Sequence, residues 1–286
     1  MIAPAATDQR TAPGLRRSAL LGLLARPQPA VMGILNLTPD SFSDGGQHDT
    51  PERALAHATR MITEGADIID VGAESTRPYD GMSPVAADDE MQRLRPVLAH
   101  VAKLGTPVSI DTMKAKVADF ALGAGASIAN DVWGLQRDPD MARVVASHRV
   151  PVIVMHNRDA VDEHIDIMAD ITAFFFRSLE IAMKAGITPD DIVLDPGIGF
   201  GKSPAQSLTV LARLRELHVF GLPLLIGASR KRFIASVTPS EPAQRLGGSL
   251  AAHLLAAREG ARILRVHDVA ETVQALRISA AIDEKR

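Results

Sequence analysis

The 286-residue chain contains no cysteine. Disulfides, thiolate nucleophiles and thiolate zinc sites are therefore excluded. Aromatic residues are scarce as well, at 3% of the chain, whereas hydrophobic residues of all kinds make up 46%. The core must be built mainly from Val, Ile, Leu and Ala, which is the composition that buried parallel strands prefer. A reducing compartment suits a chain without cysteine, and we expect a cytoplasmic protein.

The chain also lacks an excess of positive charge and any long hydrophobic run. Its formal net charge is −3, so no basic field favours a nucleic-acid partner. No apolar segment approaches the ~20 residues of a membrane-spanning helix, so we expect no membrane partner. Arg16-Arg17 precede the apolar stretch Ser18–Ala25, which is short for the core of an export signal. We expect residues 1–29 to be an N-terminal extension, flexible or forming a short packing helix.

Short apolar runs alternate with amphipathic helical patterns over residues 30–286. The predicted strands are Val31–Leu35, Asp67–Val71, Pro107–Ile110, Ser127–Ala129, Val152–Met155, Ile192–Leu194, Leu224–Ile226 and Ile263–Val266. The predicted helices include Pro51–Glu64, Asp88–Lys103, Lys114–Leu122, Asp166–Ala185, Pro204–Leu217, Arg245–Glu259 and Val269–Ile282. This alternation predicts an α/β protein with a single-domain (β/α)8 or TIM barrel. A doubly wound open sheet is the alternative, because strand counting does not exclude it.

Polar side chains stand at the carboxyl end of nearly every predicted strand. They are Asn36; Asp70 and Glu74; Asp111; Asn130 and Asp131; His156 and Asn157; Asp195; Ser229 and Lys231; Arg265 and His267. In a barrel these ends meet at one mouth, where binding chemistry resides. A lone Asp before a helix is often only a helix cap, which is the alternative for Asp111. The mixture of carboxylates, amides and cations suits a polar heterocycle together with an anion.

Two loops carry further signals. Residues 33–46 combine turn-forming Pro39, Gly45 and Gly46 with many side-chain oxygens, which is typical of a functional loop at a strand end. The glycine-rich segment 195–203 is no nucleotide-binding loop, because Pro196 and Pro204 stand where the two common fingerprints need glycine. Its glycines would let the backbone approach a flat ligand, or else form a plain turn that caps the next helix.

Cations after three strands predict an anion site. Ser229 and Lys231 precede a short predicted helix, whose N-terminus would favour an anion after the seventh strand. Arg77 can present a fork to phosphate oxygens, and Arg265 with His267 lie on one face of the last strand. A Schiff-base role for Lys231 is the rival chemistry.

The histidine pattern argues against zinc, because no pair of histidines has helical zinc-ligand spacing. Magnesium is better supported, since it prefers hard oxygen donors and takes some of them from substrate phosphates. Asn36 is the candidate metal ligand.

Taken together, these segments resemble the dihydropteroate synthases. The matching phrases, in chain order, are Asn36–Asp44, Glu74–Pro78, Ser109–Thr112, Asn130-Asp131, Met155-His156, Asp195–Lys202, Ser229–Lys231 and Arg265–Asp268. The family implies a barrel that is usually a homodimer. It joins 6-hydroxymethyl-7,8-dihydropterin diphosphate to 4-aminobenzoate and releases diphosphate with Mg2+. One departure is Tyr79, where the family commonly has glycine, so the shape of the second loop stays open.

The resemblance implies a role for each matched residue. By similarity, the pterin is held by Asp111, Asn130, Asp195 and Lys231 and lined by Met155 and Phe200; the diphosphate meets Arg77, Arg265 and His267; the aminobenzoate borders Thr76, Pro78, Phe200 and Ser229; and Mg2+ meets Asn36. The expected catalytic residues are Asp111, Asp195, Lys231, Arg265 and His267, acting by positioning and electrostatics without a covalent intermediate. The loops Asn36–Gly46 and Glu74–Gly81 are expected to close over the leaving group.

Three other functions stay open at this point. A methyltetrahydrofolate methyltransferase would share the pterin pocket but lack the diphosphate clamp. An aldolase would use Lys231 as a Schiff base, and a non-catalytic pterin-binding paralogue would bind ligand without turnover.

Overall fold

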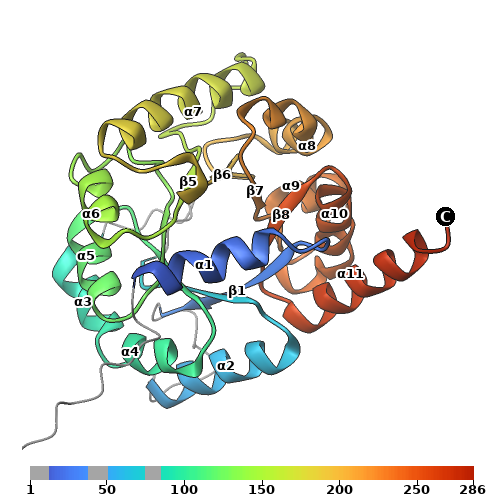
Figure 1. Cartoon of the computed structure of the whole chain (residues 1–286). Helices are drawn as coiled ribbons and strands as arrows, with labels where there is room; N and C mark the ends of the chain where they lie inside the picture. The colour runs from blue at the N-terminus through green and yellow to red at the C-terminus, as the bar shows by residue number, and fades with distance from the viewer. Residues whose placement is uncertain (1–12, 38–50, 75–84) are drawn as a thin grey trace, which may run out of the picture.

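The computed structural model describes residues 13–37, 51–74 and 85–286, which form a closed parallel barrel (Figure 1). Its strands are β1 Ala30–Asn36, β2 Ile68–Gly72, β3 Val108–Asp111, β4 Ile128–Asp131, β5 Val152–Met155, β6 Ile192–Asp195, β7 Leu224–Ile226 and β8 Ala261–Val266. Each strand pairs in parallel with the next one along the chain, and β8 closes onto β1. The (β/α)8 barrel expected from the sequence is confirmed, and the open sheet is excluded.

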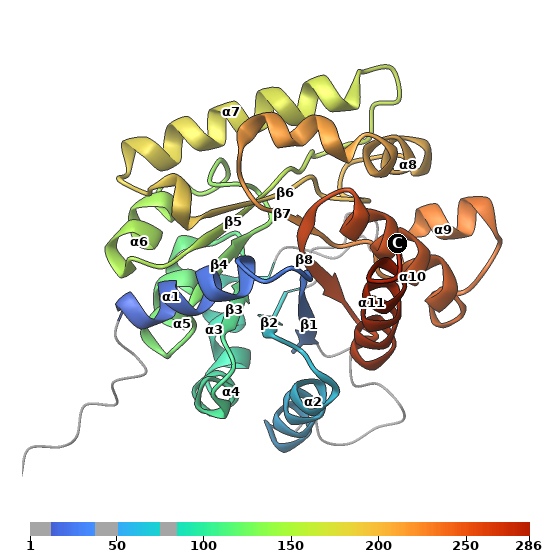
Figure 2. The same ribbon diagram turned by 45° about the vertical axis from the view of Figure 1, so that its right-hand side comes forward.

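Helices surround this barrel, as Figures 1 and 2 show from two directions. They are α2 Pro51–Glu64, α3 Ala87–Leu94, α4 Leu98–Val101, α5 Ala115–Gly123, α6 Met141–His148, α7 Ile167–Lys184, α8 Pro204–Ala212, α9 Arg232–Val237, α10 Leu246–Arg258 and α11 Val269–Asp283. Four 3-10 helices complete the described part: η3 Ala102–Leu104, η4 Pro189–Asp191, η5 Leu214–Phe220 and η6 Pro242–Gln244. The inner faces of the helices and the outer faces of the strands bury one continuous hydrophobic core, which is mainly aliphatic. Among the described residues, no helix combines the length and the hydropathy needed to cross a membrane.

Some elements differ from the sequence-based expectation. The helix predicted over 88–103 is broken into α3 and α4, because Pro96 has no N–H to continue the hydrogen-bond ladder. The helix predicted over 204–217 ends at Ala212 and continues as η5, and α6 was not among the predicted helices. Several strands also run further than predicted, so that Asn36, Asp111 and Asp195 are their last residues.

Helix α1, Pro13–Leu24, lies across the amino-terminal end of the barrel, in front of the strands in Figure 1. Leu20 is 1% exposed and packs on the innermost aliphatic layer. That layer consists of Ala30, Met32, Ile68, Ile128, Ile153, Val193, Leu225 and Ile263. The Arg262 guanidinium donates hydrogen bonds to the carbonyl oxygens of Leu24 and Arg26. A side chain of β8 thus supplies partners for carbonyls at and just beyond the end of this helix. The helix therefore closes the end of the barrel opposite the mouth.

Leu20→Ala should lower the free energy of unfolding by about 2–5 kcal/mol, because it leaves a cavity between α1 and the inner layer. Urea denaturation monitored by circular dichroism measures the change. Leu21, at 39% exposed, is the matched control on the same helix, and Leu21→Ala should change stability by no more than about 0.5 kcal/mol. Equal losses in the two variants would show that α1 does not seal the barrel.

The interior of the barrel changes character from one end to the other. Side chains of a strand alternate between inside and outside, so every second residue belongs to an interior layer. Above the aliphatic layer, at the carboxyl ends of the strands, the inward positions are occupied by Asp70, Asp111, Asn130, Met155, Asp195 and Arg265. The pairing register brings Gly72 opposite Asp111, Asp111 opposite Asn130, and Met155 opposite Asp195. A polar layer buried on an aliphatic one marks this end of the barrel as the functional end.

Candidate active site

Arg265 is the central cation of the polar layer. Its Nε donates to Asp70 Oδ2 at 2.6 Å, and its Nη2 donates to Asp111 Oδ2 at 2.6 Å. Asn130 Nδ2 lies 3.3 Å from both oxygens of Asp70, which is fully buried. Burial alone would lower the pKa of Arg265, but the carboxylates of Asp70 and Asp111 outweigh it and raise that pKa. The guanidinium therefore stays charged and holds three strands, β2, β3 and β8, together at the mouth.

Asp111 offers a free acceptor atom to the interior of the mouth. Its Oδ1 is buried and has no hydrogen-bond partner among the described residues. Burial raises the pKa of Asp111 to about 7, while the charge of Arg265 opposes this rise. The helix-cap alternative is wrong for this residue, because Asp138 Oδ2 accepts the hydrogen bond from the Ala115 N–H at the start of α5. An orphaned carboxylate oxygen at this depth is suited to a ligand donor.

Asp195 stands at the root of the glycine-rich loop 195–203. Its Oδ1 accepts a hydrogen bond from the Gly197 N–H at 2.7 Å. Burial raises the pKa of Asp195 to about 6, against the effects of this bond and of nearby Lys231 and Arg265. Gly197 has φ +66°, and a Cβ there would lie 2.0 Å from the His156 carbonyl oxygen, so only glycine fits. The loop thus packs directly on the end of β5 and directs Asp195 into the mouth.

One side of the mouth is apolar. Val132, Met155 and Phe200 form a small buried cluster, and Met113 and Trp133 pack against it. The Lys231 ammonium lies 4.0 Å from the centroid of the Phe200 ring, in cation–π contact. A slot with this apolar wall and a floor of carboxylates and an amide is suited to a flat, polar heterocycle.

The loops after β7 and β8 bring Ser229 and His267 together. Ser229 Oγ lies 3.0 Å from His267 Nδ1 and also accepts a hydrogen bond from the His267 N–H at 3.2 Å. Arg230 has φ +57°, and its guanidinium pairs with the Asp268 carboxylate. This pairing holds the guanidinium of Arg230 at Asp268, while Ser229 and His267 remain at the rim of the mouth.

Most of the other predicted site residues lie in parts of the chain that the structure does not describe. Thr76, Arg77, Pro78 and Tyr79 lie outside the described residues, as do 38–46 and 75–81 of the two loops expected to close over the leaving group. Asn36 is described and is half-buried at the end of β1. No group of three or more His, Asp or Glu in the described ranges could hold a metal ion.

Two residues of the site were missed by the sequence-based assignment. The sequence pattern indicates Asp70 only as a strand-end residue, although a charge inside the apolar run Ile68–Val71 is a signal for an inward-facing position. Lys202 ends the matching phrase Asp195–Lys202 without a predicted role, yet it is 1% exposed. Its Nζ lies 2.7 Å from His156 Nδ1, 2.9 Å from Gly197 O and 3.1 Å from Phe200 O.

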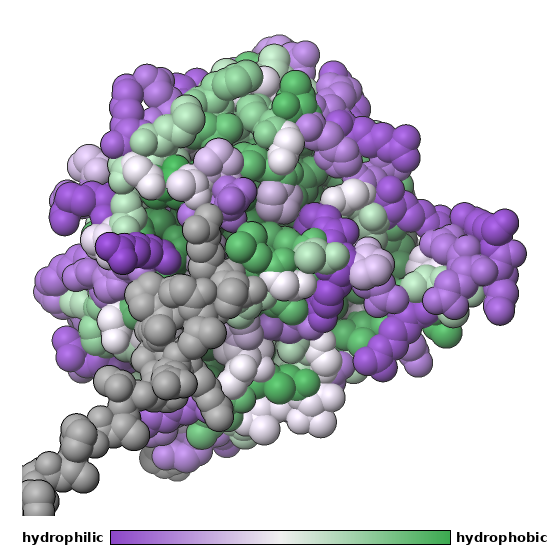
Figure 3. Space-filling view, viewed as in Figure 1, coloured by the Kyte–Doolittle hydropathy of each residue, from purple (hydrophilic) through white to green (hydrophobic). Residues whose placement is uncertain are grey.

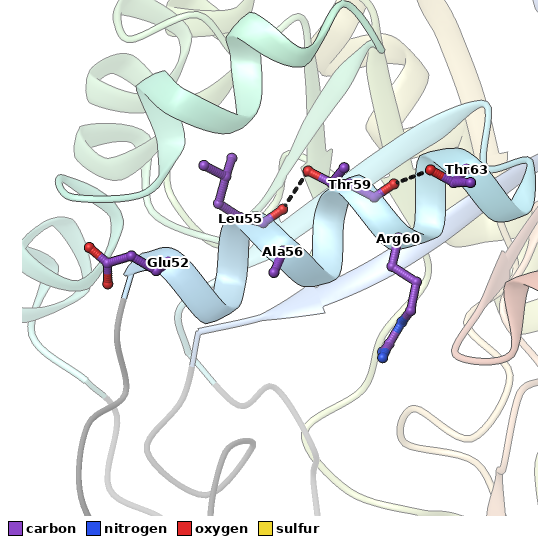
Figure 4. Close-up of a pocket in the computed structure, with 6 residues that line it drawn as sticks. All are labelled: Glu52, Leu55, Ala56, Thr59, Arg60 and Thr63. Atoms are coloured by element: carbon purple, nitrogen blue, oxygen red, sulfur yellow. Dashed lines mark hydrogen bonds between the residues drawn. The ribbon is translucent and has the colours of Figure 1, made fainter.

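A hollow of about 600 Å³ lies beside α2 and is lined by residues of that helix alone (Figure 4). These residues are Glu52, Leu55, Ala56, Thr59, Arg60 and Thr63. Two of its hydroxyls, on Thr59 and Thr63, donate to helix carbonyls one turn earlier. Because these hydroxyls are already satisfied within the helix and no residue of the polar layer lines the hollow, we assign the candidate site to the barrel mouth instead.

Comparison with known proteins gives a consistent picture. The family model described as "Pterin binding enzyme" matches residues 32–267. The dihydropteroate synthase of Bacillus subtilis is 46% identical over 256 residues, which cover 89% of this chain and 89% of that protein. A crystal structure of Xanthomonas albilineans dihydropteroate synthase with 4-aminobenzoic acid has a TM-score of 0.86 at 46% identity, covering 91% and 94% of the two chains. A structure of the same enzyme in complex with 7,8-dihydropteroate has a TM-score of 0.83 at 44% sequence identity, covering 91% of this chain and 95% of that chain.

Proposed function

The chain belongs to the dihydropteroate synthases, a family of pterin-binding enzymes, and we propose that its barrel mouth carries out their reaction. The reaction joins 6-hydroxymethyl-7,8-dihydropterin diphosphate to 4-aminobenzoate and gives 7,8-dihydropteroate and diphosphate, a step of folate biosynthesis. One observation of the site supports it most: the unpartnered, buried Oδ1 of Asp111 stands beside Asn130 in a slot with an apolar wall.

The slot matches a pterin in hydrogen-bonding capacity. The amino group and ring N–H of a pterin are donors, and the carboxylates of Asp111 and Asp195 supply acceptors for them. Arg265 favours the ionised form of Asp111 by its charge. Met155 and Phe200 cover the faces of the ring with apolar surface, and Lys231 can donate to its carbonyl oxygen. The individual contacts stay predictions.

The same residues can stabilise the transition state. The bond between the pterin methylene carbon and the diphosphate oxygen breaks as the amine nitrogen of 4-aminobenzoate attacks that carbon. Carboxylates under the ring stabilise the cationic character that develops there, and Lys231 and His267 offset charge on the departing diphosphate. The arylamine is neutral near pH 7, so it attacks without a strong base and loses its proton afterwards. Arg265 is already the counter-ion of Asp70 and Asp111, so fewer of its N–H groups remain to bind the diphosphate.

The described residues of this mouth offer too few ligands to hold a magnesium ion alone, so a bound ion would need ligands from the substrate. Asn36 supplies one hard oxygen donor, and Mg2+ commonly completes its octahedron with phosphate oxygens and water. When bound, the ion would neutralise charge on the diphosphate. We therefore propose Asn36 as the protein's ligand to a magnesium ion that arrives with the pterin substrate.

The function is tested by mixing purified protein, Mg2+, the pterin diphosphate and 4-aminobenzoate, and measuring release of diphosphate. We expect release only when both organic substrates are present. Release without 4-aminobenzoate, or none at all, would contradict the proposal. Borohydride added together with candidate carbonyl substrates should leave the protein active, because no Schiff base forms on Lys231.

Removal of divalent metal with excess EDTA should lower turnover by about 10²–10³-fold, because several kcal/mol of charge stabilisation on the leaving group is lost. Asn36→Ala should raise the Mg2+ concentration that gives half-maximal rate. Asn157→Ala is the control, because its Oδ1 already accepts the Arg158 N–H and is not assigned to metal. Full activity in EDTA would remove the metal from the scheme, whereas an unchanged Mg2+ requirement in Asn36→Ala would show that Asn36 is not its ligand.

We also propose a homodimer, formed through the neighbouring helices α10 and α11. Leu255, Ile278 and Ile282 are 42%, 58% and 51% exposed on these helices. Figure 3 shows hydrophobic surface over α7 as well, among hydrophilic groups. Phe176 and Met183 on α7 and Val219 on η5 are 59%, 60% and 74% exposed, so this face is the competing candidate for the interface. Exposed aliphatic side chains on adjacent helices are typical of an interface between identical copies.

Light scattering should give twice the chain mass for the wild type and the single-chain mass for Ile278→Glu, because a buried unpaired charge disrupts an apolar interface. Met183→Glu on α7 is the matched control, since Met183 is 60% exposed outside the proposed interface. A dimeric Ile278→Glu, or a monomeric Met183→Glu, would place the interface elsewhere.

A further inference from the structure

The glycine-rich loop 195–203 is wrapped around a buried lysine. Gly197, Gly199 and Gly201 have φ values of +66°, +78° and +56°, which turn the backbone carbonyls of the loop inward. Two of those carbonyls, on Gly197 and Phe200, accept hydrogen bonds from Lys202 Nζ at 2.9 and 3.1 Å. Lys202 is 1% exposed, so its ammonium group is buried inside the loop that it bonds to and is not a surface charge.

A histidine supplies the third acceptor, and its tautomer is fixed from outside the barrel. His156 Nε2 lies 3.0 Å from Asp170 Oδ2, which also accepts from Arg158 Nη1 at 2.8 Å. Because an ionised carboxylate can only accept, His156 Nε2 carries the hydrogen and Nδ1 is an acceptor. Lys202 Nζ lies 2.7 Å from that Nδ1. The three hydrogens of an ammonium group thus meet three acceptors.

The charge of Lys202 also acts on Asp195. Burial lowers the pKa of Lys202 to about 7, while Asp195 and Asp170 oppose this effect and Lys231 and Arg158 add to it. In turn, burial raises the pKa of Asp195 to about 6, and Lys231, Arg265 and Lys202 are the cations that oppose the rise. Burial lowers the pKa of His156 to about 4, consistent with the neutral ring that the geometry requires.

We propose that Lys202 is a positioning residue for the synthase reaction, whose ammonium group, anchored through His156 to Asp170, fixes the 195–203 loop so that Asp195 and Phe200 face the substrate. This inference rests on the proposed function. Lys202 acts through Asp195 and Phe200 and is not itself assigned to the substrate.

The test compares Lys202→Met with Lys202→Arg, and with Lys184→Met as a control on a solvent-exposed lysine of α7. Calorimetry should show that Lys202→Met binds the pterin diphosphate about 10–100-fold more weakly, as expected when a charged hydrogen-bonding group is misplaced. The KM for 4-aminobenzoate should change less than the affinity for the pterin, because Phe200 is the only residue of the loop that is also assigned to the aminobenzoate. Lys184→Met should behave as the wild type in both measurements.

The pH dependence separates this role from a purely structural one. Removing a cation that faces Asp195 raises the pKa of that carboxyl, so the acid limb of kcat/KM should move to higher pH in Lys202→Met. Lys202→Arg retains the charge and should return the limb toward its wild-type position, even where affinity is only partly restored. A folded Lys202→Met with wild-type pterin affinity and an unmoved limb would overturn the proposal.

A measurement on the unaltered protein keeps the proposal testable if Lys202→Met does not fold. Nitrogen-15 NMR of the histidine rings should show His156 as the neutral Nε2–H tautomer with Nδ1 accepting a hydrogen bond across pH 5–8. An Nδ1–H tautomer, or titration near an ordinary histidine pKa, would overturn the proposal. If the wild type makes no dihydropteroate, the proposed function fails, while pterin affinity and this spectrum still decide the role of Lys202.

Discussion

Arg265→Met should lower the free energy of unfolding by about 3–5 kcal/mol and abolish measurable turnover, because it strips the counter-ion from two buried carboxylates. Methionine keeps much of the side-chain volume, so the loss would reflect charge and hydrogen bonds more than a cavity. Asp70 and Asp111 would repel each other at the mouth, and Asp111 would bind a proton more tightly. The pterin would then meet a protonated carboxyl where it needs an acceptor.

The sign of the pH effect tests this explanation. The pKa of Asp111 is already raised above its unfolded value, and loss of Arg265 raises it further. A carboxyl with a raised folded-state pKa contributes stability that is present at low pH and is lost as pH rises through the folded pKa. In urea denaturation, the loss of unfolding free energy caused by Arg265→Met should therefore be smaller at pH 5.5 than at pH 8.

Two further variants control this experiment. Arg258→Met removes an exposed arginine from α10 and should leave stability and turnover nearly unchanged. Arg265→Lys restores a charge but has one nitrogen, so it cannot bridge Asp70 and Asp111 as the guanidinium does. We expect it to recover part of the stability and little of the activity. A fully stable Arg265→Met would show that the polar layer does not depend on this cation.

Asp195→Asn should reduce kcat/KM for the pterin diphosphate by about 10²–10³-fold, the effect of losing a preorganised electrostatic contact in a dry site. The asparagine oxygen can still accept the Gly197 N–H, so the loop should keep its shape. Its amide nitrogen, however, would present a donor to the donors of the pterin. Steady-state kinetics and calorimetry with the pterin substrate measure the loss.

Asp166→Asn is the control for this substitution, because Asp166 is the exposed N-cap of α7 and asparagine caps a helix equally well. The pH profile adds a second check. Binding needs ionised Asp111 and Asp195, whose pKa values are about 7 and about 6, so wild-type affinity should fall as pH drops through this range. Asp195→Asn should remove the lower of the two steps. Near-normal affinity in Asp195→Asn would refute its assignment to the pterin.

The sequence predicted the barrel well because its strands are short aliphatic runs between amphipathic helices. It placed strand ends less well, since a polar residue after an apolar run resembles the start of a loop. Asp111 and Asp195 instead continue their strands, because the barrel interior accepts polar side chains at its mouth. The break at Pro96 was readable in principle, whereas α6 was missed between β4 and β5.

The sequence predicted that several polar residues gather at the barrel mouth, but it did not predict which of them are bonded to one another. The position of Asp195 after an apolar run and before glycines identified it without a structure. The bonds of Arg265 to Asp70 and Asp111 could not be read from spacing, because they join β8 to β2 and β3 across most of the chain. Lys202 was equally hidden, since its partners become neighbours only when the loop folds back on β5.

The helix that closes the barrel has a consequence for the order of folding. Helix α1 leaves the ribosome before every strand, yet it shares a buried cluster with Ile263 and a hydrogen bond with Arg262 of β8, the last strand to be made. Contacts so distant in sequence form late, because long loops must close first. We expect α1 to dock only once the ring of strands is complete. During synthesis the inner aliphatic layer at that end must therefore stay exposed, or be shielded by a chaperone, until nearly the whole chain has emerged.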